Sequence, residues 1–284
     1  MKYVYLNRPF AYDQDWIEAF RSAGIECVEE NGCESFDELT FLGHSIVGND
    51  VAIPETLTEK CRNRKGKLVV FLGNEWKWFA EKRHLMHFLK ADLCVTYIPI
   101  ESAKKLYVDI PLIEIPHAMG DFYRKSVIKE NRNFDIGVRG MKYDSSKIGD
   151  NDRASICSES LWKGLRCDMG YGSMLKRTDW RRALNDWRAM PSCEAGIVGA
   201  KTIAPRHFEA IGCGTTLVMY EGEFSGILKA GEHYVPLKRD HSNIEWVTGA
   251  VLDGIGEQIS RRAFDYCLAE HTHAHRIASL MSAV

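Results

Sequence analysis

Short apolar runs alternate with amphipathic stretches along most of the chain, and this alternation predicts strands followed by helices. The first pair is KYVYLN at 2–7, rich in aromatic and branched residues, and DQDWIEAFRSAG at 13–24, whose apolar residues recur at helical spacing before a glycine. The segment IECVEE then returns to a strand. A strand–helix–strand opening of this kind predicts a parallel sheet with right-handed crossovers.

The same alternation continues through both halves of the chain. In the first half it predicts strands at 66–74 and 92–98 and helices at 75–91 and 102–107. For the second half the predicted elements are, in order, a strand at 134–140, a helix at 151–163, a strand at 164–172, a helix at 176–190, a strand at 194–200, a helix at 205–212, strands at 215–220 and 233–238, a helix at 242–254 and a last helix from about 257.

The two halves are separated by IPLIEIPHAMGDFYRKSVIKENRN, in which two prolines precede a polar, charged run. We therefore expect a first Rossmann-like domain at 1–118, a linker at 119–133, a second such domain at 134–256, and a closing helix at 257–284 that crosses back to the first domain. The predicted fold class is α/β, with two facing, doubly wound domains. A ligand is expected in the cleft at the carboxyl ends of their strands.

Composition agrees with two ordinary globular domains. The chain has 284 residues, 45% hydrophobic and 27% charged, with a net charge of −2, so its overall charge does not favour a polyanion-binding protein. Its nine cysteines are odd in number and form no Cys-x-x-Cys pair, which favours the reducing cytoplasm over a disulfide framework or a structural zinc site. No apolar run reaches 18 residues, so no transmembrane segment is expected.

The stretch PRHFEAIGCGTT at 205–216 carries the strongest chemical signal. Pro205 suits the first position of a helix, and Phe208 and Ile211 share its core-facing side. Glu209 is turned about 100° from Phe208, off that side. We expect the glycines of the following loop to expose N–H groups that cradle a phosphate, while Glu209 accepts hydrogen bonds from ribose hydroxyls. Alternatively, Glu209 is simply solvated and the glycines only turn the chain.

The segment RHFEAIGCGTTLVMYEGEFSGILKAGEHYVPLKRDHSNIEWV resembles the donor-binding half of GT-B glycosyltransferases of the group 1 type, and in particular the CgeB-like spore-maturation proteins. In those, a helix reading R-x-F-E-A-x-x-C/A-G precedes a strand, a G-E-H-Y turn and a D-x-x-N/E segment. The C-terminal AEHTHAHRIASL is similar to their H-T-x-x-x-R helix. Group 1 enzymes often carry a second acid eight positions before the ribose-binding one. Here that position is Lys201, which leaves the sugar and the stereochemistry open.

The resemblance implies a nucleotide-sugar site in the second domain. Its predicted residues are Arg139 and Lys142 after the strand at 134–140, Lys201 and Arg206 as partners of the donor phosphate, Glu209 for the ribose, and the backbone of Gly212, Cys213, Gly214, Thr215 and Thr216 for the diphosphate or its sugar. Arg139 is equally compatible with an ordinary exposed turn. The basic run KRTDWRRALNDWR reads as a solvated helix face or as a contact for an anionic acceptor.

Candidates for the group that activates the acceptor lie in the first half. They are His44 and Asp50 in LGHSIVGND, Glu75 after the strand at 66–74, and His117 in IPHAM. Helix capping by Asn74 with a favourable dipole for Glu75, and a packed structural role for His117, are the alternatives. No Asp-x-Asp motif stands at a strand end, so neither a divalent metal nor any other cofactor is expected beside the nucleotide sugar.

The sequence thus predicts a glycosyltransferase. We expect it to move a sugar from a nucleoside-diphosphate donor, UDP in the first instance, to an acceptor glycan, a small molecule or a modified DNA base. The alternatives are a nucleotide-sugar-binding module without turnover and a nucleotide-sugar epimerase or hydrolase. The oligomeric state is left open.

Overall fold

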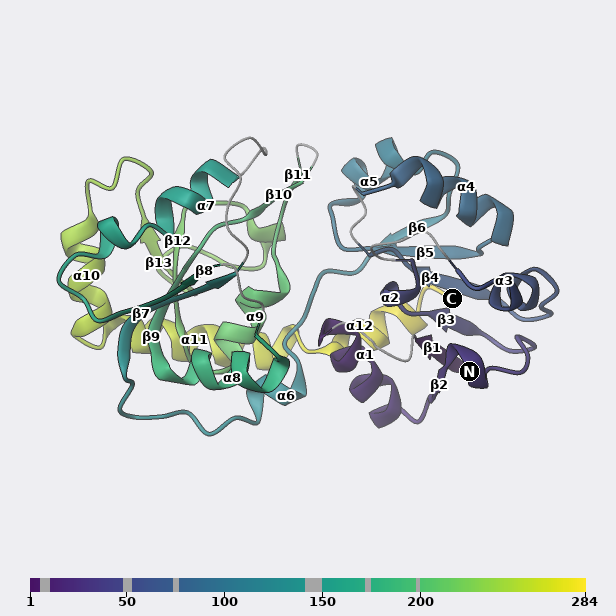
Figure 1. The fold of residues 1–284 in the computed structure, drawn as a ribbon, viewed down its shortest axis with the longest axis horizontal. Helices are drawn as coiled ribbons and strands as arrows, with labels where there is room; N and C mark the ends of the chain where they lie inside the picture. Colours follow the sequence, from purple (N-terminus) through teal and green to yellow (C-terminus); the bar gives the residue numbers. More distant parts are fainter. Residues whose placement is uncertain (6–10, 48–52, 74–76, 141–149, 172–174, 198–199) are drawn as a thin grey trace. The chain divides into compact units, whose positions relative to one another are not determined.

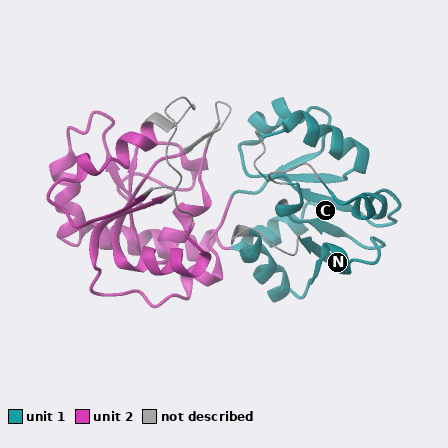
Figure 2. Cartoon of the chain, in the orientation of Figure 1, with its two compact units in different colours: residues 1–116, 198–200, 273–284 teal, residues 117–197, 201–272 magenta. Residues whose placement is uncertain are grey.

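The computed structural model spans residues 1–284 and describes all of them except 6–10, 48–52, 74–76, 141–149, 172–174 and 198–199. The chain divides into two compact units, shown in Figure 2. Unit 1 contains residues 1–116, 198–200 and 273–284, and unit 2 contains residues 117–197 and 201–272. Each unit is built around its own parallel sheet (Figure 1).

The unit 1 sheet has six parallel strands in the order β2-β1-β3-β4-β5-β6. They are β1 (Lys2–Tyr5), β2 (Glu26–Glu29), β3 (Thr40–Leu42), β4 (Leu68–Phe71), β5 (Leu93–Thr96) and β6 (Leu112–Glu114). Consecutive residues of the inner strands are both buried, as in Tyr3 and Val4 of β1 and in Val69 and Val70 of β4. Because successive strand side chains point to opposite faces, this double burial requires helices on both sides of the sheet.

Two sets of helices meet that requirement. One face is covered by α1 (Ala11–Ser22) and α12 (His273–Met281), and on it Trp16 packs 4.8 Å from Phe71 between ring centroids. Apolar residues of α2 (His44–Val47), α3 (Glu55–Arg62), α4 (Phe79–Leu89) and α5 (Ile100–Leu106) belong to the core of the other face. A short 3-10 turn at Glu30–Gly32 follows β2.

The unit 2 sheet has five parallel strands in the order β13-β12-β9-β7-β8. They are β7 (Phe134–Gly140), β8 (Cys167–Tyr171), β9 (Trp187–Ser192), β12 (Thr216–Tyr220) and β13 (Val235–Leu237); β10 (Ala195–Ile197) and β11 (Ala200–Thr202) form a separate two-stranded sheet. The central position of β9 depends on a close approach between neighbours. A Cβ atom on Gly137 of β7 would lie only 1.7 Å from the indole of Trp187.

Helices again lie on both faces of the unit 2 sheet. One core includes residues from α6 (Asp121–Arg124), α8 (Arg177–Asp186), α9 (Pro205–Gly212) and α11 (Ile255–Glu270). The core of the opposite face includes residues of α7 (Asp150–Ile156), the 3-10 turn at Glu159–Trp162 and α10 (Ile244–Leu252). A further 3-10 turn, Phe224–Gly226, follows β12. Among the described residues, no helix combines the length and the apolar character that crossing a membrane requires.

The elements differ from the sequence expectation at several points, and three of these differences change the layout of the two units. The helix expected at 176–190 ends at Asp186, and the next six residues form β9, which hydrogen bonds to strands on both sides. Strand β9 is buried at every position except Arg188, as suits a central strand covered on both faces, but the preceding helical spacing masks this pattern. The single closing helix expected at 257–284 is two helices, with α11 in unit 2 and α12 in unit 1. The strand β6 lies within the expected first domain, in the segment IPLIEIPH for which no strand was predicted.

The contact between Gly137 and Trp187 yields a first prediction. Gly137→Ala should lower the free energy of unfolding of unit 2 by about 3 kcal/mol, because the added methyl group has no room beside the buried indole. Urea unfolding followed by tryptophan fluorescence measures the effect. Gly32→Ala is the matched control, since a Cβ there meets nothing within 4 Å. Equal unfolding midpoints for the two variants would contradict the packing described for β7 and β9.

Candidate functional site

The carboxyl edge of the unit 2 sheet brings three chain segments together. Strand β9 ends there at Ser192, α9 begins at Pro205, and β12 ends at Tyr220. In open parallel sheets the ligand-binding groups come from this edge, because the loops that follow the strands converge on it. The site is therefore built from the side chains that these segments present.

A buried histidine joins the start of α9 to the end of β9. The Ala204 N–H donates to Nδ1 of His207 over 3.1 Å, so the proton of the neutral ring is assigned to Nε2, which lies 2.8 Å from the Ser192 hydroxyl. The His207 side chain is fully buried. Burial, helped by the neighbouring charge of Arg206, holds its pKa well below the ordinary value of 6.5. His207 is thus a neutral link between helix and strand.

Arg206 is fixed by the same junction. Its Nε donates to the Ser192 hydroxyl over 3.0 Å, and its Nη2 donates to the Cys193 carbonyl over 3.1 Å. The side chain is only half-buried. A cation is thereby held at the carboxyl edge within about one helical turn of Glu209.

Glu209 lies among aromatic and cationic side chains. Nε1 of Trp180, in the first turns of α8, donates to its Oε2 over 2.7 Å. Burial raises the pKa of the Glu209 carboxyl above its usual range, while hydrogen bonding to Trp180 and Tyr123 and the charges of Arg206 and Arg177 oppose that rise. We call these five residues the Glu209 cluster. It combines an oriented carboxyl group with two cations, and Glu209 itself is half-buried.

The cations of α8 are held by an aromatic ring of α6. The guanidinium carbons of Arg177 and Arg181 each lie 4.0 Å from the centroid of the Phe122 ring, and Nη1 of Arg181 donates to the Phe122 carbonyl over 3.0 Å. Stacking on an aromatic face keeps a guanidinium in a defined plane while leaving its charge in place. The first turn of α8 therefore faces Glu209 with an ordered positive charge.

A strained turn completes the edge. Phe224 and Ser225 have φ values of 41° and 54°, a left-handed conformation that non-glycine residues seldom adopt. The Phe224 N–H donates to Oε1 of Glu194 over 2.5 Å. The centroid of the Phe224 ring lies 5.6 Å from that of the His207 ring, and the two rings are nearly perpendicular. Such strain persists only where neighbouring contacts enforce it, and it is common beside functional sites.

Comparison with family models decides the identity of the chain. Residues 128–282 match the model of the glycosyl transferase-like family, which is more than half of the chain. The chain belongs to this family. The matched region contains the Glu209 cluster except for Tyr123. A comparison with curated proteins finds no match.

Solved structures show the fold of this glycosyltransferase. An alpha-glucosyltransferase in complex with UDP and a 13-mer DNA containing an HMU base aligns over 99% of this chain and 98% of its own, with a TM-score of 0.66 and 8% identity. The BGT of T4 phage in complex with UDP-glucose aligns over 98% and 97%, with a TM-score of 0.65 and 12% identity. TarM aligns over 87% of this chain and 55% of its own, at 0.57 and 10%. The two parallel-sheet α/β units therefore have the expected GT-B fold.

Arg206 and Glu209 lie within about one turn of α9, as their spacing in the sequence requires. Arg139, in contrast, is held by residues of neighbouring strands. Arg139 forms an ion pair with Asp168 of β8, and its Nη1 also donates to the Asp168 carbonyl over 2.9 Å. Trp187 donates to the other oxygen of the same carboxylate over 2.9 Å. The guanidinium of Arg139 is thus part of the packing between β7, β8 and β9.

The loop from Gly212 to Thr216 needs a correction. It lies at the amino end of β12, opposite the edge that holds Ser192, and its N–H groups close the end of α9: Cys213, Gly214 and Thr215 all donate to carbonyls of that helix. Its carbonyls accept hydrogen bonds from the buried Arg132. Gly214 has φ +65°, as the turn after a helix requires. The loop is occupied by the protein itself, and we remove it from the phosphate site.

The remaining predicted residues are placed only in part. His117 is half-buried and near enough to His207 for its charge to act on the pKa of that ring. His44 is the first residue of α2, which begins two residues after the last residue of β3, and Lys201 belongs to β11. Asp50, Glu75 and Lys142 lie outside the described residues.

Apart from Arg206, sequence reasoning missed the partners of Glu209. Arg177 and Trp180 belong to the basic run that reads as a solvated face, and Tyr123 lies in the expected linker. A usable signal was present, because the tryptophan three residues after an arginine shares its side of the helix. What the sequence did not show is that this side packs toward α9 rather than toward solvent.

Because His207 is neutral in the folded protein, we expect the free energy of unfolding to fall as the pH is lowered. Because the pKa of this histidine is depressed in the folded protein, the unfolded chain takes up its proton first as the pH falls below about 6.5. Stability should then fall toward pH 5 with a slope that includes about 1.4 kcal/mol per pH unit from this group. Chemical unfolding at a series of pH values measures it.

The variant His207→Asn keeps an acceptor for the Ala204 N–H but does not titrate. It should be less stable than the parent at pH 8 yet lose less stability between pH 6.5 and pH 5. The control His275→Asn changes an exposed residue of α12 and should leave the slope as it is. An unchanged slope in His207→Asn would rule out a neutral buried ring at this junction.

Proposed function

We propose that this glycosyltransferase uses a UDP-linked sugar and binds its nucleotide at the Glu209 cluster. The observation that supports this is the position of the Glu209 carboxyl, oriented by Trp180 and Tyr123 and flanked by Arg177 and Arg206 at the carboxyl edge of the unit 2 sheet. A nucleoside diphosphate presents ribose hydroxyls beside anionic phosphates. Hydroxyls donate to a carboxylate and phosphates pair with guanidinium groups, so the two halves of the ligand match the two halves of the cluster.

Similar solved structures favour uridine as the base. Their descriptions name UDP for the alpha-glucosyltransferase and UDP-glucose for the T4 phage enzyme. Those enzymes share the fold with this chain at 8% and 12% identity, so the nucleotide is part of our proposal. Within the family we place the chain beside the CgeB-like proteins on the strength of the RHFEAIGCG and GEHY motifs.

The cations carry the proposed chemistry. In glycosyl transfer the bond between the anomeric carbon and the diphosphate oxygen breaks, its electron pair leaves with the diphosphate, and the acceptor hydroxyl bonds to the carbon and gives up its proton. Positive charge at the leaving oxygens is then the main stabilisation required. We assign this task to Arg177 and Arg206, without a resident divalent metal. His44, Asp50, Glu75 and His117 are the candidates for the group that receives the proton.

The acceptor belongs to one of three classes: a glycan, a small molecule, or a modified base in DNA. The last is a class worth early trial because the alpha-glucosyltransferase structure holds DNA with an HMU base. The decisive experiment measures UDP release from several UDP-sugars, with and without each acceptor, in the presence of EDTA and then of Mg²⁺ or Mn²⁺. Acceptor-dependent release supports transfer. Binding without release indicates a binding module, and free sugar or an isomer without acceptor indicates a hydrolase or epimerase.

Substitution of Glu209 tests the nucleotide site directly. Glu209→Gln should weaken UDP binding by about 2 kcal/mol, roughly thirtyfold in Kd, because it removes a charge-assisted hydrogen bond while keeping the side-chain shape. Isothermal titration calorimetry gives the Kd. Glu257→Gln, an exposed acid on α11, is the matched control and should bind UDP like the parent. Wild-type affinity in Glu209→Gln would place the nucleotide elsewhere.

A further inference from the structure

One segment of the chain carries far more positive charge than the rest. Between residues 60 and 90 two acids, Glu75 and Glu81, stand against nine basic residues: Lys60, Arg62, Arg64, Lys65, Lys67, Lys77, Lys82, Arg83 and Lys90. The whole chain has 37 Lys and Arg against 39 Asp and Glu, so the remainder is clearly acidic. Such segregation in a nearly neutral protein is the footprint of a surface for a polyanion.

Packing within unit 1 brings part of this charge together at the surface, whereas Lys82 is fully buried and donates to the Gly73 carbonyl. Nη1 of Arg64 donates to the Leu89 carbonyl over 2.7 Å, which ties the end of α3 to the end of α4. Beside this contact the guanidinium carbon of Arg62 lies 4.4 Å from the centroid of the Phe88 ring. Arg64 itself is committed to carbonyls and to Asp92. Five other cations of the segment have no acid partner among the described residues: Arg62, Lys65, Lys77, Arg83 and Lys90.

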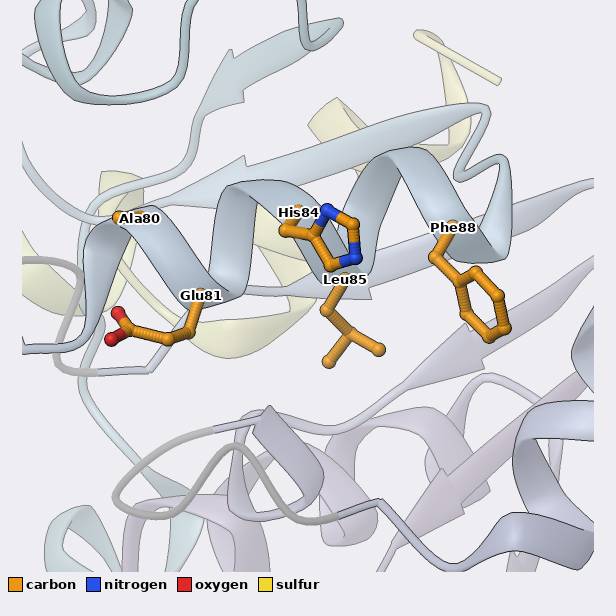
Figure 3. A pocket seen from close by; sticks show the side chains of 5 residues that line it. All are labelled: Ala80, Glu81, His84, Leu85 and Phe88. Carbon is orange, nitrogen blue, oxygen red and sulfur yellow. The ribbon is translucent and has the colours of Figure 1, made fainter.

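Aromatic rings are interleaved with these cations. Trp78, Phe79 and Phe88 are 58%, 42% and 42% exposed, unusual values for large apolar side chains. Along α4 an open hollow of about 640 Å³ is lined by Ala80, Glu81, His84, Leu85 and Phe88. Figure 3 shows these side chains along α4, with the His84 and Phe88 rings about one turn apart. We call the surface of residues 62–65 and 77–90 the α4 face.

We propose that the α4 face binds a strand of nucleic acid. Phosphates would pair with the cations that lack an acid partner, and unpaired bases would stack on Phe88 and on the two rings at the start of α4. Alternation of cations and rings suits a polymer in which phosphates alternate with bases. This binding is separate from sugar transfer and does not depend on the Glu209 cluster.

The arrangement of the rings argues against an anionic membrane as the partner. A helix that lies in a membrane surface collects its apolar residues on one continuous side. Phe79 and Phe88 are nine residues apart, so at 100° per residue they lie on opposite borders of the exposed side of α4. Between them come Arg83, His84 and His87. Polar residues therefore separate the two rings, which do not form one continuous apolar side.

Fluorescence anisotropy with a labelled single-stranded oligodeoxynucleotide tests the proposal, with the full chain and no nucleotide sugar. We expect binding that weakens with salt. The double variant Arg62→Ala/Lys65→Ala should reduce the slope of log K against log salt by about 1.4, since each lost phosphate contact contributes roughly 0.7 for a single strand. The matched control, Lys229→Ala/Lys238→Ala, removes two exposed cations from unit 2 and should leave the slope unchanged.

Two substitutions of Phe88 separate stacking from apolar contact. Phe88→Trp should bind at least as tightly as the parent, whereas Phe88→Leu should bind about tenfold more weakly, because leucine keeps the apolar bulk but offers no ring to a base. Trp246→Ala, an exposed ring of α10 in unit 2, is the control. Unchanged melting temperatures show that all variants fold.

Three outcomes would overturn the proposal. One is an oligonucleotide affinity that none of the α4-face variants alters. A second is the absence of oligonucleotide binding at low salt. The third is co-sedimentation with phosphatidylserine vesicles that Phe88→Leu preserves, since that result would make the face a membrane contact. Because every measurement is of binding alone, failure here leaves the transferase activity untouched, and failure of the transferase assay leaves this result standing.

Discussion

The hydrogen bond between His207 and Ser192 is the contact on which the candidate donor site depends, because it joins the first turn of α9 to the last residue of β9. Arg206 takes its position from the same hydroxyl, and Glu209 follows within about one helical turn. A neutral imidazole can accept from the Ala204 N–H and donate to Ser192 at once, whereas a protonated ring can only donate. Burial keeps the ring neutral, so the junction fixes a cation and a carboxyl group without adding a charge of its own.

Glu209 is a more constrained group than its place in the sequence suggests. An acid turned off the core side of a helix is expected to face water, yet here its carboxyl already accepts from Trp180 and is partly withdrawn from solvent. Because the carboxyl is already oriented before a ligand binds, less free energy is spent on ordering it during binding. In the proposed site, the cations that help to keep the carboxyl ionised, Arg177 and Arg206, would also face the donor phosphate. Carboxyl and phosphate would thus share one positive field.

The fold follows from the sequence to a large extent because parallel strands that are buried on both faces are written as continuous apolar runs. LVVF in β4 and TLVMY in β12 are short and rich in branched residues, which favours strands next to amphipathic segments. The strand β9 was not predicted, because it follows α8 without a loop and the helical spacing of apolar residues continues through Trp187. The three residues each of β3 and β6 are too few for a pattern to emerge.

Site residues could be predicted only where they are close to one another in the sequence. Arg206 and Glu209 share a helix, so one motif identifies both, whereas Trp180 and Tyr123 reach Glu209 from α8 and α6, and no spacing in the sequence records that approach. The loop at Gly212–Thr216 shows the reverse case. Its glycines suit a phosphate cradle until Arg132, about eighty residues earlier, is seen to occupy its carbonyls. Glycine content describes what a backbone can do, and tertiary contacts decide whether its groups are free.

Cations in this protein are of two kinds, which differ in whether groups of the fold itself bind them. Arg132 donates to carbonyls of α8, β9 and the α9–β12 loop, and Arg139 is bound by Asp168, so both serve the packing of unit 2. Arg62 and Arg83 have no acid partner among the described residues, and Arg62 lies over the exposed Phe88 ring of unit 1. A buried cation must be satisfied by its own chain, because desolvation is otherwise too costly. An exposed one without a partner carries no such constraint. Charge that the fold does not use is therefore the charge left for a ligand, and on this criterion the α4 face is the surface of unit 1 with the clearest capacity to bind a polyanion.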